Sequence, residues 1–281
     1  MPTRPGPTVQ RRRLGIELRR LREAAGKNID EVAQVLECSD SKVSRIENGQ
    51  VSASPRDVRD MLEFYGVDSE RRDELVEFAR AARKKGWWEA YSDTPAVPLV
   101  GLEVAADRIL AYEPMVVPGL LQTEGYARSM IRAIRPELPG EQTERWVEFR
   151  MARQRLLEQE DAPSLDVILE ECALRRPVGR RSVMRKQLQH LVEIAELPNL
   201  TLRVLPLSTG EHPGMTGAFH IYRFLKRTEP DVVFLEHTIS DLYLENHAQV
   251  ERYSATFERL RQAAMSPRRS TTFVSTLVED L

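Results

Sequence analysis

The chain has 281 residues and a formal net charge of −2, with 41% hydrophobic residues. This length allows two domains with packed cores, and the near-neutral charge excludes a protein that coats nucleic acid through its overall charge. The two cysteines, Cys38 and Cys172, lie far apart and form no disulfide framework, which suits a reducing cytoplasm. No stretch approaches the roughly 18 apolar residues of a membrane helix, and the N-terminus lacks the apolar core of an export signal. We therefore expect a cytoplasmic protein without a membrane span.

Basic side chains gather at the start of the chain, where few acidic residues balance them. This asymmetry indicates a local nucleic-acid surface, and a solvated arm is the alternative for residues 1–10. Those proline-rich residues are predicted to form a flexible basic arm. Leucines at helical spacing predict a first helix from about residue 11 to Gly26. It leaves Arg11, Arg12 and Arg19 free to lie near a DNA backbone.

Residues 28–49 predict two short helices joined by a tight turn. Asn28 can cap the first helix, with Glu31 three residues later as the reciprocal partner. Ser39 offers a second N-cap, and Gly49 favours a left-handed end to the second helix. Polar and cationic groups, of the types that reach base edges and phosphates, occupy the non-apolar side of this second helix: Asp40, Ser41, Lys42, Ser44, Arg45 and Asn48.

Two more helices complete the predicted DNA-binding region. Ser54 and Pro55 form a strong helix start, because serine caps well and proline suits the first helical position. That helix closes at Gly66, and another begins at Ser69. Together with the first three helices, they give an all-α five-helix domain over residues 11–84.

Residues 85–99 are predicted to be a linker, because two prolines interrupt the pattern there. The adjacent Trp87 and Trp88 allow two interpretations: a docking point between domains, or packing against the neighbouring helix. The linker separates the five-helix domain from residues 100–281.

The run SRIENG, after a short EVAQVL helix, resembles the phage-repressor-like (XRE) helix-turn-helix family over about residues 11–67. The resemblance implies that the second helix of the pair enters the major groove of double-stranded DNA. It implies an ion pair between Arg22 and Glu47. The implied base contacts are Asp40, Ser41, Ser44 and Arg45. The predicted phosphate contacts are Arg11, Arg12, Asn28, Lys42, Asn48 and Arg56.

Asp40 departs from this resemblance, because phage repressors commonly carry an amide at that position. A carboxylate there repels phosphate but can accept a hydrogen bond from a cytosine amino group. The alternative interpretation of residues 28–49 is a helical hairpin that never meets DNA. The caps, the apolar positions and SRIENG together favour DNA binding.

Residues 100–281 alternate between helical and strand patterns. The predicted helices are Gly101–Tyr112, a segment from Thr123, Gly140–Gln159, Ser182–Glu196, His247–Ala264 and Pro267–Val278. The predicted strands begin at Ser164 and cover 200–206, 218–224, 231–237 and 242–245. Short links favour antiparallel neighbours. We expect an α+β domain with helices packed on a mainly antiparallel sheet of four or five strands.

The runs PGLLQTEGYAR, ALRRPVG (173–179) and DLYLE (241–245) resemble the C-terminal domain that follows XRE helix-turn-helices in a large group of bacterial regulators. Such regulators are often encoded beside a small BldB-like partner protein, in an antitoxin-like arrangement. This resemblance implies a sensor, partner-binding or dimerisation domain.

The C-terminal domain offers no catalytic constellation, so we expect neither an enzyme nor a cofactor or metal. His220 and His237 lie on adjacent predicted strands and are the one pair that we expect to be able to meet. Glu170 and Glu171 are neighbours along a strand and point to opposite faces. The glycine-rich residues 210–217 lack the ending of a phosphate loop and are predicted to connect two strands. A basic cluster around Pro177 suits either an anion, an acidic partner or a solvated turn: Arg175, Arg176, Arg180 and Arg181.

We therefore expect a sequence-specific transcriptional regulator that acts as a homodimer, because one recognition helix reads only a few base pairs. The first alternative keeps the DNA-binding module and makes residues 100–281 an antitoxin-like domain that sequesters a small partner protein. The second alternative makes them an enzyme or a small-molecule sensor.

Overall fold

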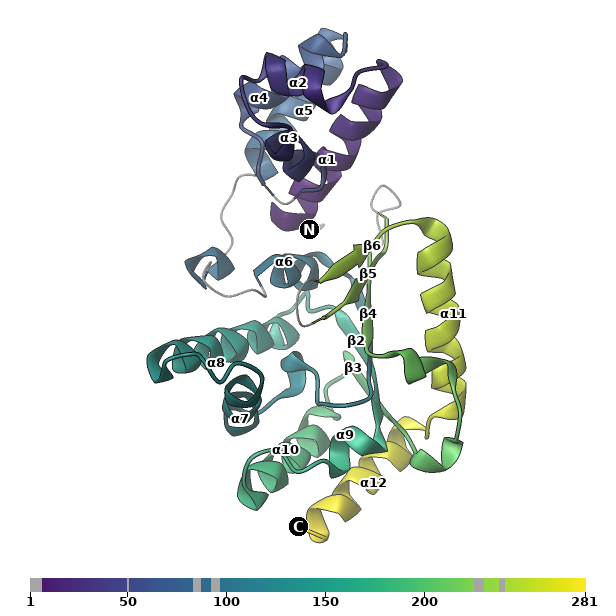
Figure 1. Cartoon of the computed structure of the whole chain (residues 1–281). Helices are drawn as coiled ribbons and strands as arrows, with labels where there is room; N and C mark the ends of the chain where they lie inside the picture. The colour runs from purple at the N-terminus through teal and green to yellow at the C-terminus, as the bar shows by residue number, and fades with distance from the viewer. Residues whose placement is uncertain (1–6, 50, 83–86, 92–96, 225–229, 238–240) are drawn as a thin grey trace. The chain divides into compact units, whose positions relative to one another are not determined.

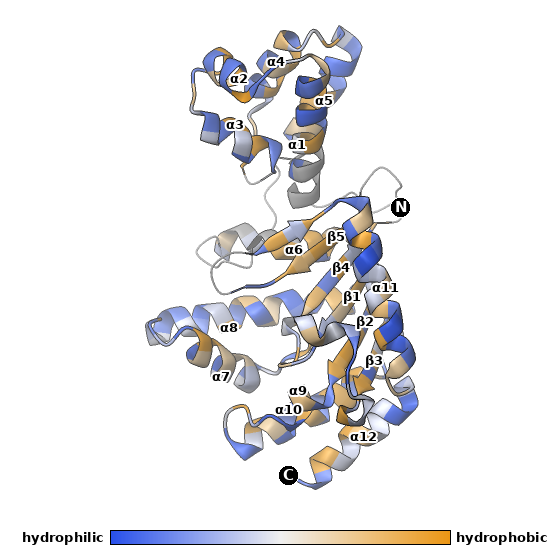
Figure 2. Ribbon diagram, turned by 45° about the vertical axis from the view of Figure 1, so that its right-hand side comes forward, coloured by the Kyte–Doolittle hydropathy of each residue, from blue (hydrophilic) through white to orange (hydrophobic). Residues whose placement is uncertain are grey.

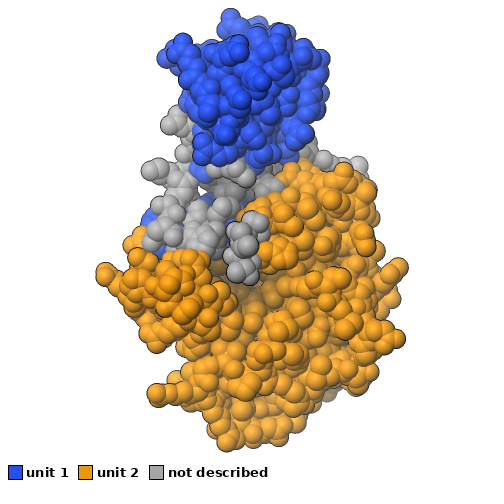
Figure 3. All heavy atoms as spheres, viewed as in Figure 1, with its two compact units in different colours: residues 1–105 blue, residues 106–281 orange. Residues whose placement is uncertain are grey.

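A computed structural model describes residues 7–49, 51–82, 87–91, 97–224, 230–237 and 241–281. The chain divides into Met1–Ala105 and Ala106–Leu281, called unit 1 and unit 2 (Figure 3). The expected linker contains the 3₁₀ helix η1 (Trp87–Tyr91) and the start of α6 (Val97–Ala105), and its other residues lie outside the described ones.

Unit 1 is all-α in its described part (Figure 1). Besides η1 and α6 it contains α1 (Pro7–Ala24), α2 (Ile29–Val35), α3 (Asp40–Glu47), α4 (Pro55–Phe64) and α5 (Ser69–Ala82). Because α1 starts at Pro7, the prediction of a flexible arm is wrong for residues 7–10. Proline suits the first turn of a helix, where its missing N–H would have no partner. Residues 1–6 lie outside the described residues.

One apolar core holds α1–α5 together. Side chains at helical spacing on every helix point into it, and the fully buried ones include Leu18, Val32, Val43, Val58 and Leu62. Burying a side chain of this size contributes roughly 1.5–3 kcal/mol. Most of the stability of the short helices α2, α3 and α4 therefore comes from packing, since isolated helices of this length are marginal in water.

In the described residues, unit 2 contains one six-stranded sheet in the order β3-β2-β1-β4-β5-β6. The strands are β1 (Arg108–Glu113), β2 (Ser164–Glu170), β3 (Leu200–Leu205), β4 (Phe219–Arg223), β5 (Val232–Leu235) and β6 (Leu242–Leu244). Strand β1 pairs in parallel with β2, and β2 with β3, whereas the pairings β1–β4, β4–β5 and β5–β6 are antiparallel. The predicted α+β class is confirmed.

The predicted helix over residues 101–112 is wrong in its second half. The helix α6 ends at Ala105, and Arg108–Glu113 is strand β1 near the centre of the sheet. Ile109, Leu110 and Ala111 are all buried, because both faces of this strand are covered. A short run that is apolar on both sides fits a helix and a central strand equally well. This strand also makes the observed strand number higher than the predicted four or five.

Helices cover both faces of the sheet (Figure 1). On one face, α11 (His247–Ala263) packs Val250, Phe257 and Leu260 against strand residues such as Ile221 and Val233. On the other face lie α7 (Glu124–Ile134), α8 (Gly140–Gln154) and α10 (Arg181–Ile194). Figure 2 shows hydrophobic strands between helices whose outer sides are hydrophilic. The connections through α7–α8 and through α10 explain the parallel pairs, which require long crossovers.

Shorter segments complete unit 2. The helix α9 (Glu171–Arg175) follows β2 directly, and α12 (Pro267–Glu279) packs beside α10 and along β3. Four short 3₁₀ helices lie in the described connections: η2 (Gly119–Leu121), η3 (Arg155–Glu158), η4 (Leu207–Thr209) and η5 (Pro213–Thr216). The helix η4 precedes the glycine-rich residues 210–217 and η5 lies within them. These residues connect β3 to β4 as predicted.

Candidate nucleic-acid interface

Local hydrogen bonds fix both ends of the two-helix element. Asn28 Oδ1 accepts from the Glu31 N–H at 2.8 Å, and Glu31 Oε2 accepts from the Asn28 N–H at 2.8 Å, so the predicted capping box forms. Ser39 Oγ accepts from the Lys42 N–H at 3.3 Å and caps α3. Gly49 ends the element with φ +67°, a left-handed conformation that glycine adopts without strain. The element begins and ends where the sequence predicts.

The polar side of α3 faces away from the core of unit 1. Val43 and Ile46 are buried on the inner side. Asp40, Ser41 and Arg45 are exposed and Ser44 is partly exposed, so the four predicted base contacts lie on the accessible side of one helix. Arg45 Nε donates to the Ser41 carbonyl at 3.2 Å.

An ion pair inside unit 1 fixes the C-terminal end of α3. Arg22 Nε and Nη2 donate to the two carboxylate oxygens of Glu47 at 2.7 and 3.0 Å, and both side chains are almost fully buried. Arg22 Nη1 also donates to the Lys27 carbonyl at 2.8 Å. The bonds to Glu47 raise the pKa of Arg22 further above its ordinary value. This bidentate pair, implied by the XRE resemblance, links α1 to α3 and sets the angle at which α3 is presented.

The predicted phosphate contacts are less uniform. Asn28 and Asn48 are exposed, and the side chain of Arg56 is 90% exposed. Lys42 Nζ lies 3.3 Å from Asp57 Oδ2. Partial burial works to raise the pKa of Asp57, but hydrogen bonds from Ser54 and Lys42 outweigh it and hold that pKa below its ordinary value. Lys42 is therefore partly occupied by a carboxylate of α4.

The arginines of α1 differ from one another. The expectation that Arg19 is free is wrong, because its Nε lies 2.9 Å from Glu23 Oε1. The two residues are four apart on one helix face, where ion pairs form readily. Arg11 is partly buried, and the side chain of Arg12 lies outside the described residues.

Comparisons with known proteins give two family matches. Residues 13–75 match the family described as Helix-turn-helix domain, and residues 97–276 match the family described as Domain of unknown function (DUF5753). The chain belongs to the DUF5753 family. The first match contains α2 and α3, so unit 1 carries a helix-turn-helix DNA-binding domain. No curated protein and no solved structure matches the chain.

Three features of the helix-turn-helix domain are not predicted from the sequence. A Cβ at Gly15 would lie 2.5 Å from the carbonyl oxygens of Ile46 and Glu47, so α1 touches the backbone of α3 there. Glu37 has φ +49° in the turn between α2 and α3, a conformation that non-glycine residues rarely adopt. The buried Tyr65 hydroxyl has no hydrogen-bond partner in the described structure. An isolated glycine inside a helical pattern is the one signal that pointed to Gly15.

The polar groups of the DUF5753 region pair inside the fold. His220 Nε2 lies 2.9 Å from Glu113 Oε1, and His237 is exposed beyond the end of β5, so the expectation that His220 meets His237 is not met. Tyr112 donates to Glu170, and His212 Nε2 lies 3.3 Å from the same carboxylate. Burial, with Glu170 as acceptor, raises the pKa of Tyr112 well above its ordinary value.

Arg175 Nε donates to Glu171 Oε1 at 2.5 Å, so the two adjacent glutamates have different partners. The prediction that both lie along one strand is wrong, because β2 ends at Glu170 and Glu171 begins α9. Within the residues that the structure describes, no three histidine, cysteine or acidic side chains gather as metal ligands would. None of the helices in the described residues has both the length and the apolar character needed to cross a bilayer.

Proposed function

We propose that this protein is a cytoplasmic, sequence-specific transcriptional regulator that binds double-stranded DNA as a homodimer. The observation that carries the proposal is the exposed polar side of α3, presented by a helix whose inner side and C-terminal end are fixed. A rigid helix with short polar side chains and one arginine fits the major groove, where base edges carry a unique pattern of donors and acceptors.

The side chains of α3 fall into two roles. Ser41, Ser44 and Arg45 read base edges, with Arg45 suited to the two acceptors of guanine. Asp40 accepts from a cytosine amino group. The exposed amide of Asn48 and the guanidinium of Arg56 bind phosphates, which position the helix without reading sequence.

A homodimer supplies the specificity that one copy of α3 lacks. Each good base contact discriminates by about 1–3 kcal/mol, and one helix reaches only a few base pairs. Two copies on half-sites one helical turn apart double the number of bases read. Unit 2 in this proposal serves regulation and dimerisation and not catalysis.

Selection of binding sites tests the proposal directly. Purified full-length protein is mixed with random double-stranded DNA, and the retained fragments are sequenced. We expect an enriched motif with two related halves. Retention without enrichment over several rounds, or no retention at low salt, would overturn sequence-specific binding.

A second candidate for unit 2 is binding of a small partner protein. Two large apolar side chains in the β3–β4 connection favour it: Leu207 is 60% exposed and Met215 is 71% exposed. Both belong to the same connection, and exposed apolar patches commonly mark interaction sites. Co-purification with the product of the adjacent gene is the test. A complex that the Met215→Lys variant abolishes would support this role, and no complex at micromolar concentration would exclude that partner.

A further inference from the structure

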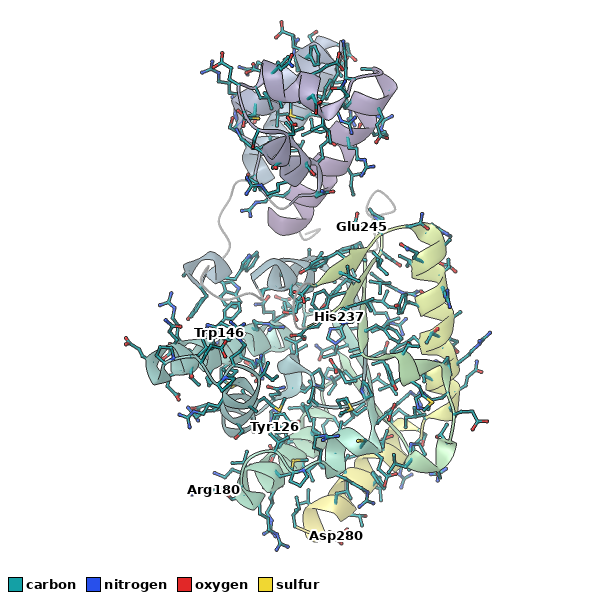
Figure 4. The ribbon with its side chains drawn as sticks, in the orientation of Figure 1. Tyr126, Trp146, Arg180, His237, Glu245 and Asp280 are labelled. Atoms are coloured by element: carbon teal, nitrogen blue, oxygen red, sulfur yellow. The ribbon has the colours of Figure 1, made fainter. Side chains whose placement is uncertain are left out.

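A pocket with a volume of about 350 Å³ opens between α9, α10 and the end of α12. Its apolar wall consists of Leu174, Met184, Leu188 and Leu277, which all lie in the core of unit 2. Arg175, Arg180 and Arg181 line the same pocket. Figure 4 shows Arg180 at the start of α10 and Asp280 at the end of α12. The volume lies at the lower end of the range of roughly 300–1,000 Å³ for small-molecule sites.

The three arginines differ in how their charge is balanced. Arg175 Nε lies 2.5 Å from Glu171 Oε1, and its guanidinium lies over the ring of Phe273. Arg181 Nη2 donates at 3.2 Å to the backbone carbonyl of Asp280, which carries no full charge. Arg180 is exposed, and in the described structure neither it nor Arg181 has a carboxylate within ion-pair distance. Two guanidinium groups without a direct ion-pair partner therefore lie beside an apolar cavity.

Asp280 provides the only side-chain carboxylate among the residues that line the pocket. Its negative charge partly offsets the two arginines and lowers the attraction for an anion. The pocket therefore combines an apolar wall, an excess of arginine and one opposing acidic side chain.

We propose that this pocket binds a small organic anion with an apolar body, of the class of medium-chain carboxylates. The hydrocarbon packs against Leu174, Met184, Leu188 and Leu277, and the carboxylate receives hydrogen bonds from Arg180 and Arg181. Guanidinium groups match carboxylates in geometry and form short charge-assisted bonds with them. Nothing in this inference requires that α3 bind DNA.

Isothermal titration of the full-length protein with octanoate, in the absence of DNA, tests the site. Octan-1-ol keeps the apolar body without the charge, and acetate keeps the charge without the body. We expect saturable binding of octanoate at one site per chain, and binding at least about tenfold weaker for the other two. This factor corresponds to the loss of one charge-assisted hydrogen bond or of the apolar contact.

Variants then assign the binding to the pocket. Arg180→Gln and Arg181→Gln should each weaken octanoate binding about tenfold, and Asp280→Asn should strengthen it. Arg185→Gln is the matched control, because Arg185 is an exposed arginine of α10 that does not line the pocket. Its affinity should equal that of the unchanged protein.

Three results would overturn the proposal. They are no saturable octanoate binding up to millimolar concentration, equal affinity for octan-1-ol, and unchanged affinity in the Arg180 and Arg181 variants. Circular dichroism establishes that each variant is folded. Asp280→Asn tests the same electrostatic argument in the opposite direction, so unchanged affinity in that variant would also count against the site.

Discussion

Arg45 has the properties of a base-contacting side chain that its own helix holds in place. Its Nε donates to the Ser41 carbonyl one turn earlier, which orients the guanidinium along α3. The side chain is nevertheless exposed, and the guanidinium carries four further N–H donors on Nη1 and Nη2. Such a fork matches the two acceptors that guanine presents in the major groove.

Replacing Arg45 by alanine should weaken binding to the selected DNA site by about 1–3 kcal/mol and relax the preference at one base position. The reason is that the lost fork leaves one base pair unread while the fold of unit 1 is unaffected. Gel-shift titrations against the selected site and its single-base variants measure both effects. Wild-type affinity and wild-type base preference in this variant would contradict the assignment of α3 to the groove.

Arg56→Ala serves as the matched control for this prediction. The Arg56 side chain is 90% exposed, and we assign it to a phosphate contact. Its loss should weaken binding to all sequences alike and lower the salt slope by about one unit, with no change in base preference. Loss of Arg45 should therefore change the base preference, whereas loss of Arg56 should change only the overall affinity and its salt dependence.

Among the elements, those of the helix-turn-helix domain are predicted well because their boundaries depend on local chemistry. Asn28, Ser39 and Ser54 cap helices through hydrogen bonds to residues three positions away. Strand β1 is missed because its identity depends on neighbours far along the chain: Ile109 lies between Leu165 and Tyr222. Helical spacing alone does not reveal such partners.

For the candidate interface too, the sequence predicts the features that depend on local spacing and misses those that depend on distant side chains. Which side of α3 is polar follows from the spacing of Val43 and Ile46, and the structure places those two side chains inside. The Lys42–Asp57 and Arg19–Glu23 pairs are missed, because competing ion pairs depend on side-chain positions that residue type does not fix. The Arg22–Glu47 pair is found through family resemblance, since 25 residues separate its members.

The close contact between α1 and α3 at Gly15 should make this position intolerant of a larger side chain. In Gly15→Ala, the new methyl group would lie 2.5 Å from two backbone oxygens of α3, which cannot move without shifting the helix. Overpacking of this kind costs about 1–3 kcal/mol, against a gain of up to about 1 kcal/mol in helix propensity. We expect lower stability of unit 1 in urea denaturation and weaker DNA binding, because α3 is displaced.

Gly125→Ala is the control, because Gly125 is also a helical glycine. Its added methyl group would meet only the Val183 side chain, at 3.5 and 3.6 Å, which is ordinary contact. Stability should be unchanged or higher by up to about 1 kcal/mol. If Gly15→Ala behaved like Gly125→Ala, the close approach of α1 to α3 would be wrong.

The stability of unit 1 as a whole should depend on pH through Glu17, which joins α1 to α5. Its carboxylate accepts from Arg20 at 2.8 Å and from Arg71 at 3.2 Å. The bond with Arg20 lowers its pKa, partial burial opposes this, and Arg71 lowers it further, so the net pKa lies below the ordinary 4.5. A lowered folded-state pKa contributes stability that is fully present above the unfolded value and is lost as pH falls through the folded value.

Urea denaturation between pH 6 and pH 3 should therefore show the free energy of unfolding of unit 1 falling below about pH 4.5. Glu17→Gln should make this fall shallower, and Arg71→Ala should give an intermediate slope, since it removes one of the two partners. Other carboxylates with lowered pKa, such as Asp57, keep part of the dependence. An identical slope in Glu17→Gln and the unchanged protein would refute the role of Glu17.

Assembly on DNA is the property that only the complete molecule can show. If two copies bind together, affinity for a site with two halves should exceed that for one half by far more than the twofold statistical factor. Because the two recognition helices of such a dimer face the same side of the duplex, half-sites about 10 base pairs apart should bind best. Inserting about 5 base pairs turns one half-site to the opposite face and should remove the gain, and inserting a full turn should restore part of it.

Mass photometry of the complexes gives the number of chains on each DNA. One chain per duplex, with equal affinity for one and two halves, would show that a single copy of α3 suffices.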